Sequence, residues 1–394
     1  MVNGIKDNIG GGDVMRNVVI GRLVKQPAGF KAFIPEKFPP FNSIDLDEKS
    51  NRLYTEAVFQ LGKLDGITQL LPDLDFFIFM YVRKEAALSS QIEGTKATMI
   101  DSIRAEAEIT QNLPHDVDDI LHYIKAMNYG LKRISEFPLS LRFLREVHGV
   151  LMKDGRTNQF VTPGEFRTSQ NWIGGGSPAT ANFVPPPVYE MNQALHDFEN
   201  FLCRENSFLP LVKTALAHAQ FETIHPFNDG NGRTGRLLTT FYLYQQKVLE
   251  RPVLYLSEYF KKNRQSYFDL LDNYHNKGDV ISWLNFFFEG VAEVAKQAII
   301  TSRQVTKLRQ RDTGRMPLLG RAAASGTVVL QELYKLPIVS VKTVEKWTGL
   351  SRVNANKLVD KFVKLGILEQ INKKETYARE FKYKDYLSVF SKNA

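Results

Sequence analysis

The stretch HPFNDGNGRTGR, residues 225–236, places one histidine, one aspartate, three glycines and two arginines within twelve positions. Gly230 and Gly232 allow the chain to turn tightly and bring its N–H groups close to a ligand. The residues that follow, RTGRLLTTFYLY, favour a helix, whose first N–H groups and dipole attract an anion. We therefore expect a mainly α-helical fold with an anion-binding loop at the start of this helix.

The charged side chains of this loop suit phosphate chemistry. Arg233 and Arg236 are one helical turn apart, so both guanidinium groups could face one anionic chain. Asp229 would repel a phosphate unless it held Mg²⁺ between itself and the phosphates. His225, with an ordinary pKa of about 6.5, can accept a proton at neutral pH. A P-loop is excluded because its Gly-Lys-Ser/Thr string is missing.

Bulk composition indicates an ordinary globular protein. The 394 residues include 43% hydrophobic and 24% charged residues, and the length favours two or three domains. No apolar run is long enough to span a membrane and no signal peptide is visible, so we expect a soluble cytoplasmic protein. Cys203 is the only cysteine, which excludes an intrachain disulfide and a cysteine metal cluster. The net charge is +8, and residues 326–394 carry much of it, with 13 basic and 7 acidic residues.

The periodicity of apolar residues predicts five segments along the chain. Residues 1–14 are rich in glycine and are expected to form a disordered leader. An N-terminal helical region is expected over 15–137, a second helical region, which carries the 225–236 motif, over 138–304 and a linker over 305–325. Within the second helical region, residues 161–188 contain five prolines and four glycines, which favours a β-hairpin flap. Residues 326–394 combine three short helices with a basic hairpin, a pattern typical of a winged helix-turn-helix.

The motif at 225–236 resembles the signature of the Fic family, His-x-Phe-x-Asp/Glu-Gly-Asn-Gly-Arg-x-x-Arg, at every specified position. The similarity in layout extends from about Phe41 to Arg303. Fic enzymes mostly transfer AMP from ATP to a protein hydroxyl, so the resemblance implies a protein adenylyltransferase that uses ATP, Mg²⁺ and a Ser, Thr or Tyr hydroxyl of a target protein or of itself.

The resemblance also implies roles for individual residues. His225 would be the general base, Asp229 the Mg²⁺ ligand, and Phe227 the anchor of the loop in the core. Nucleotide contacts would come from the loop, the helix after it and two aromatic residues further on: Gly230, Asn231, Gly232, Arg233, Thr234, Gly235, Arg236, Tyr267 and Phe268. Tyr267 and Phe268 could equally be core residues. The flap ATANFVPPP, 179–187, would pair with an extended target segment through Phe183, Val184 and Pro185.

A second motif, in ALSSQIEGTKA, contains Ser89, Glu93 and Gly94 and resembles the family's inhibitory motif, Ser/Thr-x-x-x-Glu-Gly/Asn. Its position ahead of the signature is similar to that in the class II enzymes, which have an N-terminal inhibitory helix. A Glu93 carboxylate paired with Arg236 would occupy the guanidinium that the γ-phosphate needs. The same residues would also describe a polar helix end capped by glycine.

The basic C-terminal segment leaves several functions open. Arg352, Asn354, Lys357, Lys361 and Lys364 could contact DNA from a recognition helix, with Lys373 and Lys374 on the wing. Winged helices also dock proteins or form homodimers, and lysines at helical spacing are commonly a solvated face. The alternatives to adenylyl transfer are a DNA-binding regulator in which the Fic core senses a nucleotide, and a Fic enzyme that removes AMP.

Overall fold

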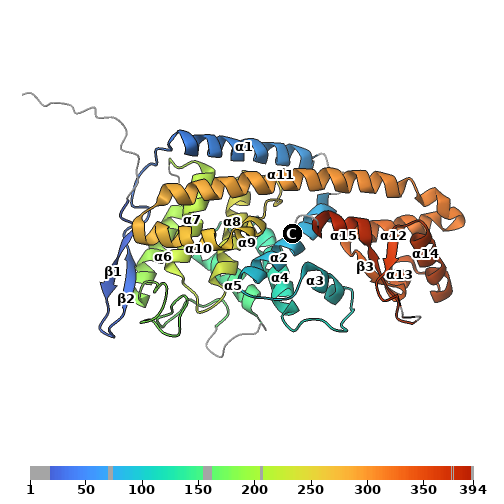
Figure 1. Cartoon of the computed structure of the whole chain (residues 1–394), viewed down its shortest axis with the longest axis horizontal. Helices are drawn as coiled ribbons and strands as arrows, with labels where there is room; N and C mark the ends of the chain where they lie inside the picture. Colours follow the sequence, from blue (N-terminus) through green and yellow to red (C-terminus); the bar gives the residue numbers. More distant parts are fainter. Residues whose placement is uncertain are drawn as a thin grey trace, which may run out of the picture.

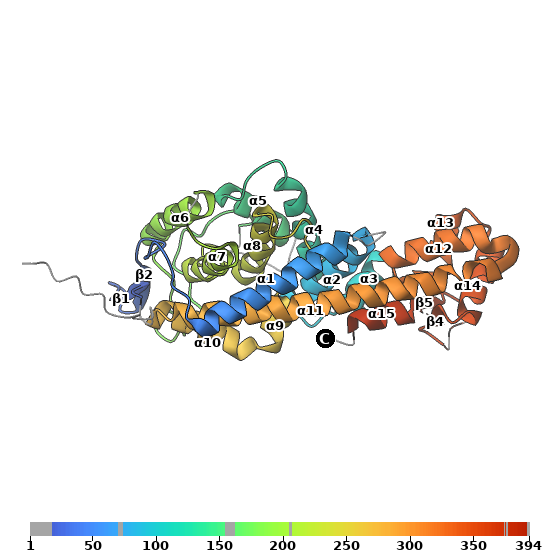
Figure 2. The same ribbon diagram turned by 90° about the horizontal axis from the view of Figure 1, so that it is seen from above.

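The computed structural model describes residues 18–69, 74–153, 162–204, 207–373, 375 and 377–391. Two long helices, α1 (Glu48–Gln69) and α11 (Val280–Thr313), lie side by side along one face of the molecule (Figures 1 and 2). The predicted leader, residues 1–14, and Lys374 lie outside the described residues. The prediction of a mainly helical protein with small sheets is confirmed.

The helical core is built around two helices that are buried over most of their length, α7 (Pro210–Ile224) and α8 (Asn231–Gln245). Trp283 of α11 stacks on His218 of α7 and donates from its indole N–H to the Ala215 carbonyl (2.9 Å). The helices that surround the pair are α4 (Val117–Arg133), α5 (Leu141–Met152), α6 (Val188–Cys203), α9 (Ser257–Lys262) and α10 (Arg264–Lys277). Because α7 and α8 are enclosed on several sides, the loop between them is held from several directions.

The N-terminal region carries a further helix pair, α2 (Leu74–Ile92) and α3 (Met99–Glu106). Thr98 begins α3 with a capping box, in which its side chain accepts from the Asp101 N–H while Asp101 accepts from the Thr98 N–H. The end of α2 reaches α8, so residues just after position 88 approach the 225–236 motif. This contact brings the two sequence motifs together.

A short hairpin precedes these helices, where the sequence predicted a helical region from residue 15. Its strands are β1 (Gly21–Lys25) and β2 (Lys31–Pro35), paired antiparallel with Leu23 opposite Phe33. Strands of five residues carry little alternation of polarity, and this explains why periodicity missed them. The Phe33 N–H donates to the Val184 carbonyl (2.9 Å), so the hairpin is joined to the flap.

The flap over 162–187 contains less strand than predicted. A single antiparallel bridge, between Ile173 and Phe183, closes the loop. Gly174 and Gly175 adopt positive φ angles of 71° and 68° at the turn, a conformation that favours glycine. Pro185, Pro186 and Pro187 cannot donate to a strand ladder, which limits the pairing.

The C-terminal segment continues directly from α11. The predicted linker, 305–325, is helical here: α11 extends to Thr313, and η1 (Met316–Ala322) leads into α12 (Ala323–Lys335). The remaining elements are β3 (Ile338–Ser340), α13 (Val341–Thr348), α14 (Arg352–Lys364), β4 (Leu368–Gln370), β5 (Glu380–Tyr383) and α15 (Lys384–Ser391). The three strands form an antiparallel sheet in the order β3-β5-β4.

Two sets of contacts attach the C-terminal segment to the rest of the molecule, one through α15 and one through the end of α11. Phe390 of α15 packs edge-on against Tyr81 of α2, with ring centroids 5.6 Å apart. The fully buried Asp312 carboxylate, near the end of α11, accepts hydrogen bonds from Arg311 (2.8 Å), Arg315 (3.1 Å) and the Tyr383 hydroxyl of β5. Within the described ranges, no helix has the length and apolar composition needed to cross a membrane.

Candidate active site

The loop from His225 to Gly230 joins two buried helices through two left-handed residues. His225 ends α7 with φ 48° and ψ 60°, and Gly230 precedes α8 with φ 76° and ψ 8°. A positive φ is uncommon for histidine and marks a conformation that the surrounding contacts must maintain. The first helical hydrogen bond of α8 runs from the Thr234 N–H to the Gly230 carbonyl (2.9 Å). The preceding N–H groups have no helical acceptor and remain suited to an anion.

Asn231 holds the loop closed from within. Its Oδ1 accepts from the Phe227 N–H (2.8 Å), and its Nδ2 donates to the Phe227 carbonyl (2.8 Å). The side chain is 2% exposed, so it acts as a brace for the loop. The sequence predicted Asn231 as a nucleotide contact, and this geometry leaves only its backbone N–H for that purpose.

His148 of α5 supports the same loop from the other side. Its ring lies 3.7 Å from that of Phe227 in a parallel stack, which anchors Phe227 in the core as predicted from the resemblance. The Nδ1 atom accepts the Gly164 N–H (2.9 Å), which leaves Nε2 to donate to the Asp229 carbonyl (3.0 Å). The sequence did not identify His148 as part of the site, because nothing in a helical pattern reveals which loop a histidine contacts.

Two residues of the flap also hold the loop that begins at His225. Arg167 donates from Nε to the His225 carbonyl (3.0 Å), and Asn171 donates to the carbonyls of His225 (3.2 Å) and Phe227 (3.0 Å). Arg167 is 1% exposed, and burial lowers its pKa to about 10. The left-handed conformation of His225 is therefore maintained by hydrogen bonds from outside its own helix.

The His225 imidazole is set up to accept a proton. Its Nδ1 lies 3.3 Å from the Glu222 carbonyl, so this nitrogen carries the hydrogen and Nε2 is left with a free lone pair. Burial lowers the pKa of His225 to about 4, and the nearby Arg167 charge acts in the same direction. The imidazole is therefore neutral at pH 7, the state that a general base requires.

A cavity of about 850 Å³ opens beside this loop, large enough for a nucleotide. Ten of the residues predicted from the sequence line it: His225, Asp229, Gly230, Asn231, Gly232, Arg236, Tyr267, Phe268, Glu93 and Phe183. Those that do not line it are Arg233, Thr234, Gly235, Ser89, Gly94, Val184 and Pro185. The structure thus gathers residues from the end of α2, the flap, the 225–236 loop and α10 around one space.

Arg236 and Glu93 meet at the wall of this cavity. The Arg236 guanidinium donates to the Glu93 carboxylate (2.7 Å), to the Ser89 hydroxyl (2.7 Å) and to the Ser89 carbonyl (3.0 Å). Burial opposes ionisation of Glu93, but the Arg236 charge outweighs it and keeps the pKa of Glu93 below its ordinary value. Gly232 lies directly beneath Glu93, where a Cβ would run into the carboxylate. Gly94 follows with φ 98°, just beyond the end of the helix.

Arg233 has a different environment from Arg236. Its guanidinium lies 3.5 Å from the Met152 sulfur, 3.8 Å from the Asp229 carboxylate and 4.0 Å from Asp119. The sequence predicted that both arginines face one anionic chain, whereas in the structure their side chains contact different elements. Thr234 is fully buried, and its hydroxyl donates to the Gly230 carbonyl (2.8 Å).

The two predicted aromatic residues differ in exposure. Tyr267 is 1% exposed and its hydroxyl bonds to His218 Nε2 (2.8 Å), so most of this residue belongs to the core. Phe268 is 37% exposed, and the Arg264 guanidinium lies 4.8 Å from its ring centre. Sequence reasoning missed the other twelve lining residues, which include Trp172, Glu222, Arg264 and His275. Of these residues, Arg264 could have been found from the sequence, because it lies in the same helical segment as Phe268, a predicted nucleotide contact.

Asp229 offers the donor chemistry that Mg²⁺ prefers. Its side chain is 51% exposed at the cavity, and Oδ1 also accepts the Gly230 N–H (2.6 Å). Among the described residues, no group of three or more His, Cys, Asp or Glu side chains could hold a metal alone. One carboxylate beside an anion-binding loop nevertheless fits Mg²⁺, which is commonly held by one or two carboxylates together with substrate phosphates.

Comparison with protein families places the motif in a known context. Residues 138–243 match the Fic/DOC family, and residues 51–132 match the Fic/DOC family N-terminal region. The chain is similar to the protein adenylyltransferase Fic of Culex quinquefasciatus, with 33% identity over 165 residues. It is also similar to a probable protein adenylyltransferase of Aquifex aeolicus, with 28% identity over 186 residues.

These alignments are partial. The first covers 41% of this chain and 29% of the Culex protein, and the second covers 47% of this chain and 54% of the Aquifex protein. A solved Fic family protein from Desulfovibrio desulfuricans G20 matches 86% of this chain and 97% of its own, with a TM-score of 0.56 and 18% identity, which shows a shared fold. The chain therefore contains a Fic N-terminal domain at residues 51–132 and a Fic domain at residues 138–243.

Proposed function

We propose that this protein is an adenylyltransferase that transfers AMP from ATP to a Ser, Thr or Tyr hydroxyl of a protein. The observation that carries the proposal is the neutral His225 imidazole beside the anion-binding start of α8, within a cavity of about 850 Å³. The adenylyltransferase names of the partial relatives support it.

The transfer is an in-line displacement at the α-phosphate. His225 Nε2 accepts the proton of the target hydroxyl as its oxygen attacks the α-phosphorus, the P–O bond to the β-phosphate breaks, and pyrophosphate leaves. The Nδ1–H bond to the Glu222 carbonyl (3.3 Å) holds the ring in the orientation and tautomer that this requires. Asp229 would hold Mg²⁺, which neutralises phosphate charge when bound. The first N–H groups of α8 and the Arg236 guanidinium bind phosphate oxygens.

The target segment binds along the flap. Ile173 and Phe183 form its single bridge, and Phe183 lines the cavity with His225. An extended peptide that adds a strand at this point would bring a hydroxyl to His225, because backbone pairing fixes the path of the peptide independently of most side chains. The Val184 carbonyl already accepts a hydrogen bond from the Phe33 N–H, so the target would have to pair with other backbone groups of the flap.

The Glu93 carboxylate inhibits the transfer. Its hydrogen bond to Arg236 (2.7 Å) uses the guanidinium that would otherwise bind the terminal phosphates of ATP. ATP then binds without this contact, and its α-phosphate is not held in line with the hydroxyl. Residues 74–94 would thus act as an inhibitory helix of the class II kind.

Residues 326–394 are proposed to form a winged helix. The order of α12, β3, α13, α14, β4 and β5, with the strands arranged β3-β5-β4, supports this interpretation. Formation of a homodimer through this segment stays a prediction.

The position of the label on ATP tests the proposed reaction. The protein is incubated with Mg²⁺ and with ATP labelled either at the α-phosphate or at the γ-phosphate, and covalent label is measured on the denatured protein and on added candidate targets. Adenylyl transfer retains only the α-label. Retention of the γ-label would mean phosphoryl transfer and would contradict the proposal.

A further inference from the structure

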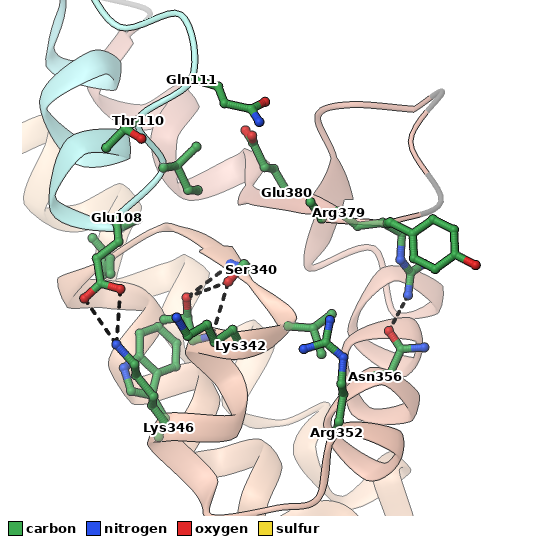
Figure 3. Close-up of a pocket in the computed structure, with 18 of the residues that line it drawn as sticks. Glu108, Thr110, Gln111, Ser340, Lys342, Lys346, Arg352, Asn356, Arg379 and Glu380 are labelled. Carbon is green, nitrogen blue, oxygen red and sulfur yellow. Dashed lines mark hydrogen bonds and ion pairs between the residues drawn. The ribbon is translucent and has the colours of Figure 1, made fainter.

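A second cleft, of about 940 Å³, lies between the Fic N-terminal domain and the C-terminal segment (Figure 3). One wall is residues 106–111, at the end of α3 and just after it, and the other is formed by residues 340–357 and 377–380. The side chains that line the cleft include five cations, Lys342, Lys346, Arg352, Lys357 and Arg379, and three anions, Glu106, Glu108 and Glu380. Cationic side chains outnumber anionic ones in this lining. Which of them are already paired within the protein decides what charge the cleft presents to a ligand.

Two of the three carboxylates are paired with arginines that do not line the cleft. Glu106 accepts from Arg83 Nε (3.1 Å), and Glu380 pairs with Arg104 (3.3 Å). Their charges are therefore largely compensated from behind the wall. Only Glu108 pairs with a cation of the cleft, Lys346, at 3.2 Å.

The cleft has more cationic side chains than the one carboxylate, Glu108, that pairs with them from its own lining can neutralise. In the described part of the chain, neither Lys342 nor Lys357 has an ion pair or a hydrogen bond from its ammonium group. Arg352 is 73% exposed in its side chain and lies 3.7 Å from Glu345, at the edge of an ion pair. Arg379 donates to Asn356 (2.6 Å) and forms an ion pair with Asp360 (3.1 Å). The cleft thus presents at least three cations to a ligand.

Glu108 is held in a conformation that other contacts must maintain. Its φ of 59° is left-handed, which costs a non-glycine residue free energy. Its side chain is 69% exposed and that of Lys346 is 57% exposed, so water and salt screen the pair and make it weak. Glu108 is therefore an internal anion that a stronger external anion can displace.

The cation-bearing wall includes an exposed face of helix α14. Ala355, Leu358 and Val359 of α14 are buried, so the helix presents the opposite face, with Arg352 and Lys357, to the cleft. Lysine, arginine and asparagine are the side chains that contact phosphates and base edges when such a helix enters the major groove. Tyr377, 86% exposed, stands on the hairpin beside this helix. An acidic peptide would meet the same charges but would not need the helix and hairpin together.

We propose that this cleft binds the phosphate backbone of duplex DNA in competition with the Glu108 carboxylate. DNA that contacts α13 and α14 replaces the Glu108–Lys346 pair with phosphate contacts. This binding does not depend on adenylyl transfer, so the two proposals can fail separately.

The test measures binding of a fluorescent 30-base-pair duplex of random sequence to the full-length protein, over a salt series starting at about 50 mM. Replacing Lys342, Arg352 and Lys357 together with glutamine should weaken binding about tenfold or more. It should also make the slope of log affinity against log salt shallower by about one for each phosphate that the variant no longer neutralises. Glu108→Gln should strengthen binding about twofold to fivefold, since it frees Lys346 and removes a repulsive charge.

Lys132→Gln is the control, because Lys132 is an exposed lysine of α4 that lines neither the cleft nor the active-site cavity. It should bind duplex as the wild type does. The proposal is overturned if the wild type does not bind the duplex, if Lys132→Gln and Lys357→Gln weaken binding equally, or if Glu108→Gln fails to strengthen it. Displacement of the duplex by poly-glutamate at equal charge would also overturn it, in favour of an acidic protein ligand.

Discussion

The Arg236 guanidinium donates a hydrogen bond of 2.7 Å to the Glu93 carboxylate, although the two residues are 143 positions apart in the sequence. The Arg236 side chain is only 2% exposed, and the Ser89 hydroxyl and carbonyl take its other hydrogen bonds. The cation best placed for a nucleotide phosphate is therefore already satisfied within the protein. A nucleotide must replace Glu93 to use it fully.

Removing the Glu93 carboxylate should activate the protein. A charge-assisted hydrogen bond is worth about 1.5–3 kcal/mol, so Glu93→Gly should raise incorporation of α-labelled ATP by about tenfold to a hundredfold. Glu136→Gly is the control, because Glu136 is a surface acid that pairs with Arg133 at 3.5 Å and does not line the cavity. Equal incorporation by the wild type and Glu93→Gly would rule out inhibition by this residue.

On the acid side, kcat/KM should fall only at a pH well below the ordinary pKa of histidine. Burial lowers the pKa of His225 to about 4, so the imidazole is still neutral at about pH 5.5. Since a general base works in its neutral form, kcat/KM of Glu93→Gly should stay level as the pH falls from about 7.5 to about 5.5 and should drop only on approach to about pH 4. Half-loss of kcat/KM near about pH 6.5 would show that His225 titrates as a solvated histidine.

His148→Phe tests the support of the loop. Phenylalanine preserves the stack on Phe227 but removes the hydrogen bonds to the Gly164 N–H and the Asp229 carbonyl. In the Glu93→Gly background, we expect kcat to fall about tenfold or more and the Mg²⁺ concentration for half-maximal rate to rise, because Asp229 is no longer held in place. His196→Phe, on the exposed face of α6, should change neither value. A fall in kcat with an unchanged Mg²⁺ requirement would contradict a role in placing Asp229.

Asp312→Asn tests the attachment of the C-terminal segment. The buried Asp312 carboxylate accepts from Arg311, Arg315 and Tyr383, and the neutral amide cannot accept all three. We expect the free energy of unfolding to fall by about 1–3 kcal/mol, measured by chemical denaturation. Asp385→Asn is matched to it, since Asp385 also accepts from Arg311 (2.8 Å) but is 43% exposed, and it should cost much less. Equal losses in the two variants would mean that burial of Asp312 contributes nothing.

The chemistry of the loop could be predicted from sequence because its determinants are local. The glycines at 230 and 232, the helix that follows and the histidine before them lie within one short stretch, so turn geometry and helix N-terminal chemistry apply directly. The mainly helical fold was likewise visible in the apolar periodicity. The Glu93–Arg236 contact was expected only through resemblance to a family motif, because sequence spacing says nothing about residues 143 positions apart.

The remaining features depend on tertiary contacts. Arg233 and Asn231 were assigned to nucleotide binding by their positions in the motif, but Met152 and the Phe227 backbone determine where their side chains lie. The β1–β2 hairpin was missed because its five-residue strands are too short for periodicity. Residues 305–313 were assigned to a linker, whereas packing against the C-terminal segment continues the helix to Thr313.

The most direct test of proton abstraction by His225 compares Glu93→Gly with the double variant Glu93→Gly/His225→Ala in α-labelled ATP and Mg²⁺. Binding of ATP is checked in parallel by its effect on thermal unfolding, which His225→Ala should leave in place because the phosphate contacts remain. We predict that the single variant acquires AMP on a Ser, Thr or Tyr side chain located by mass spectrometry, and that the double variant stays at background. Equal labelling of the two variants would contradict the assignment of His225 as the general base.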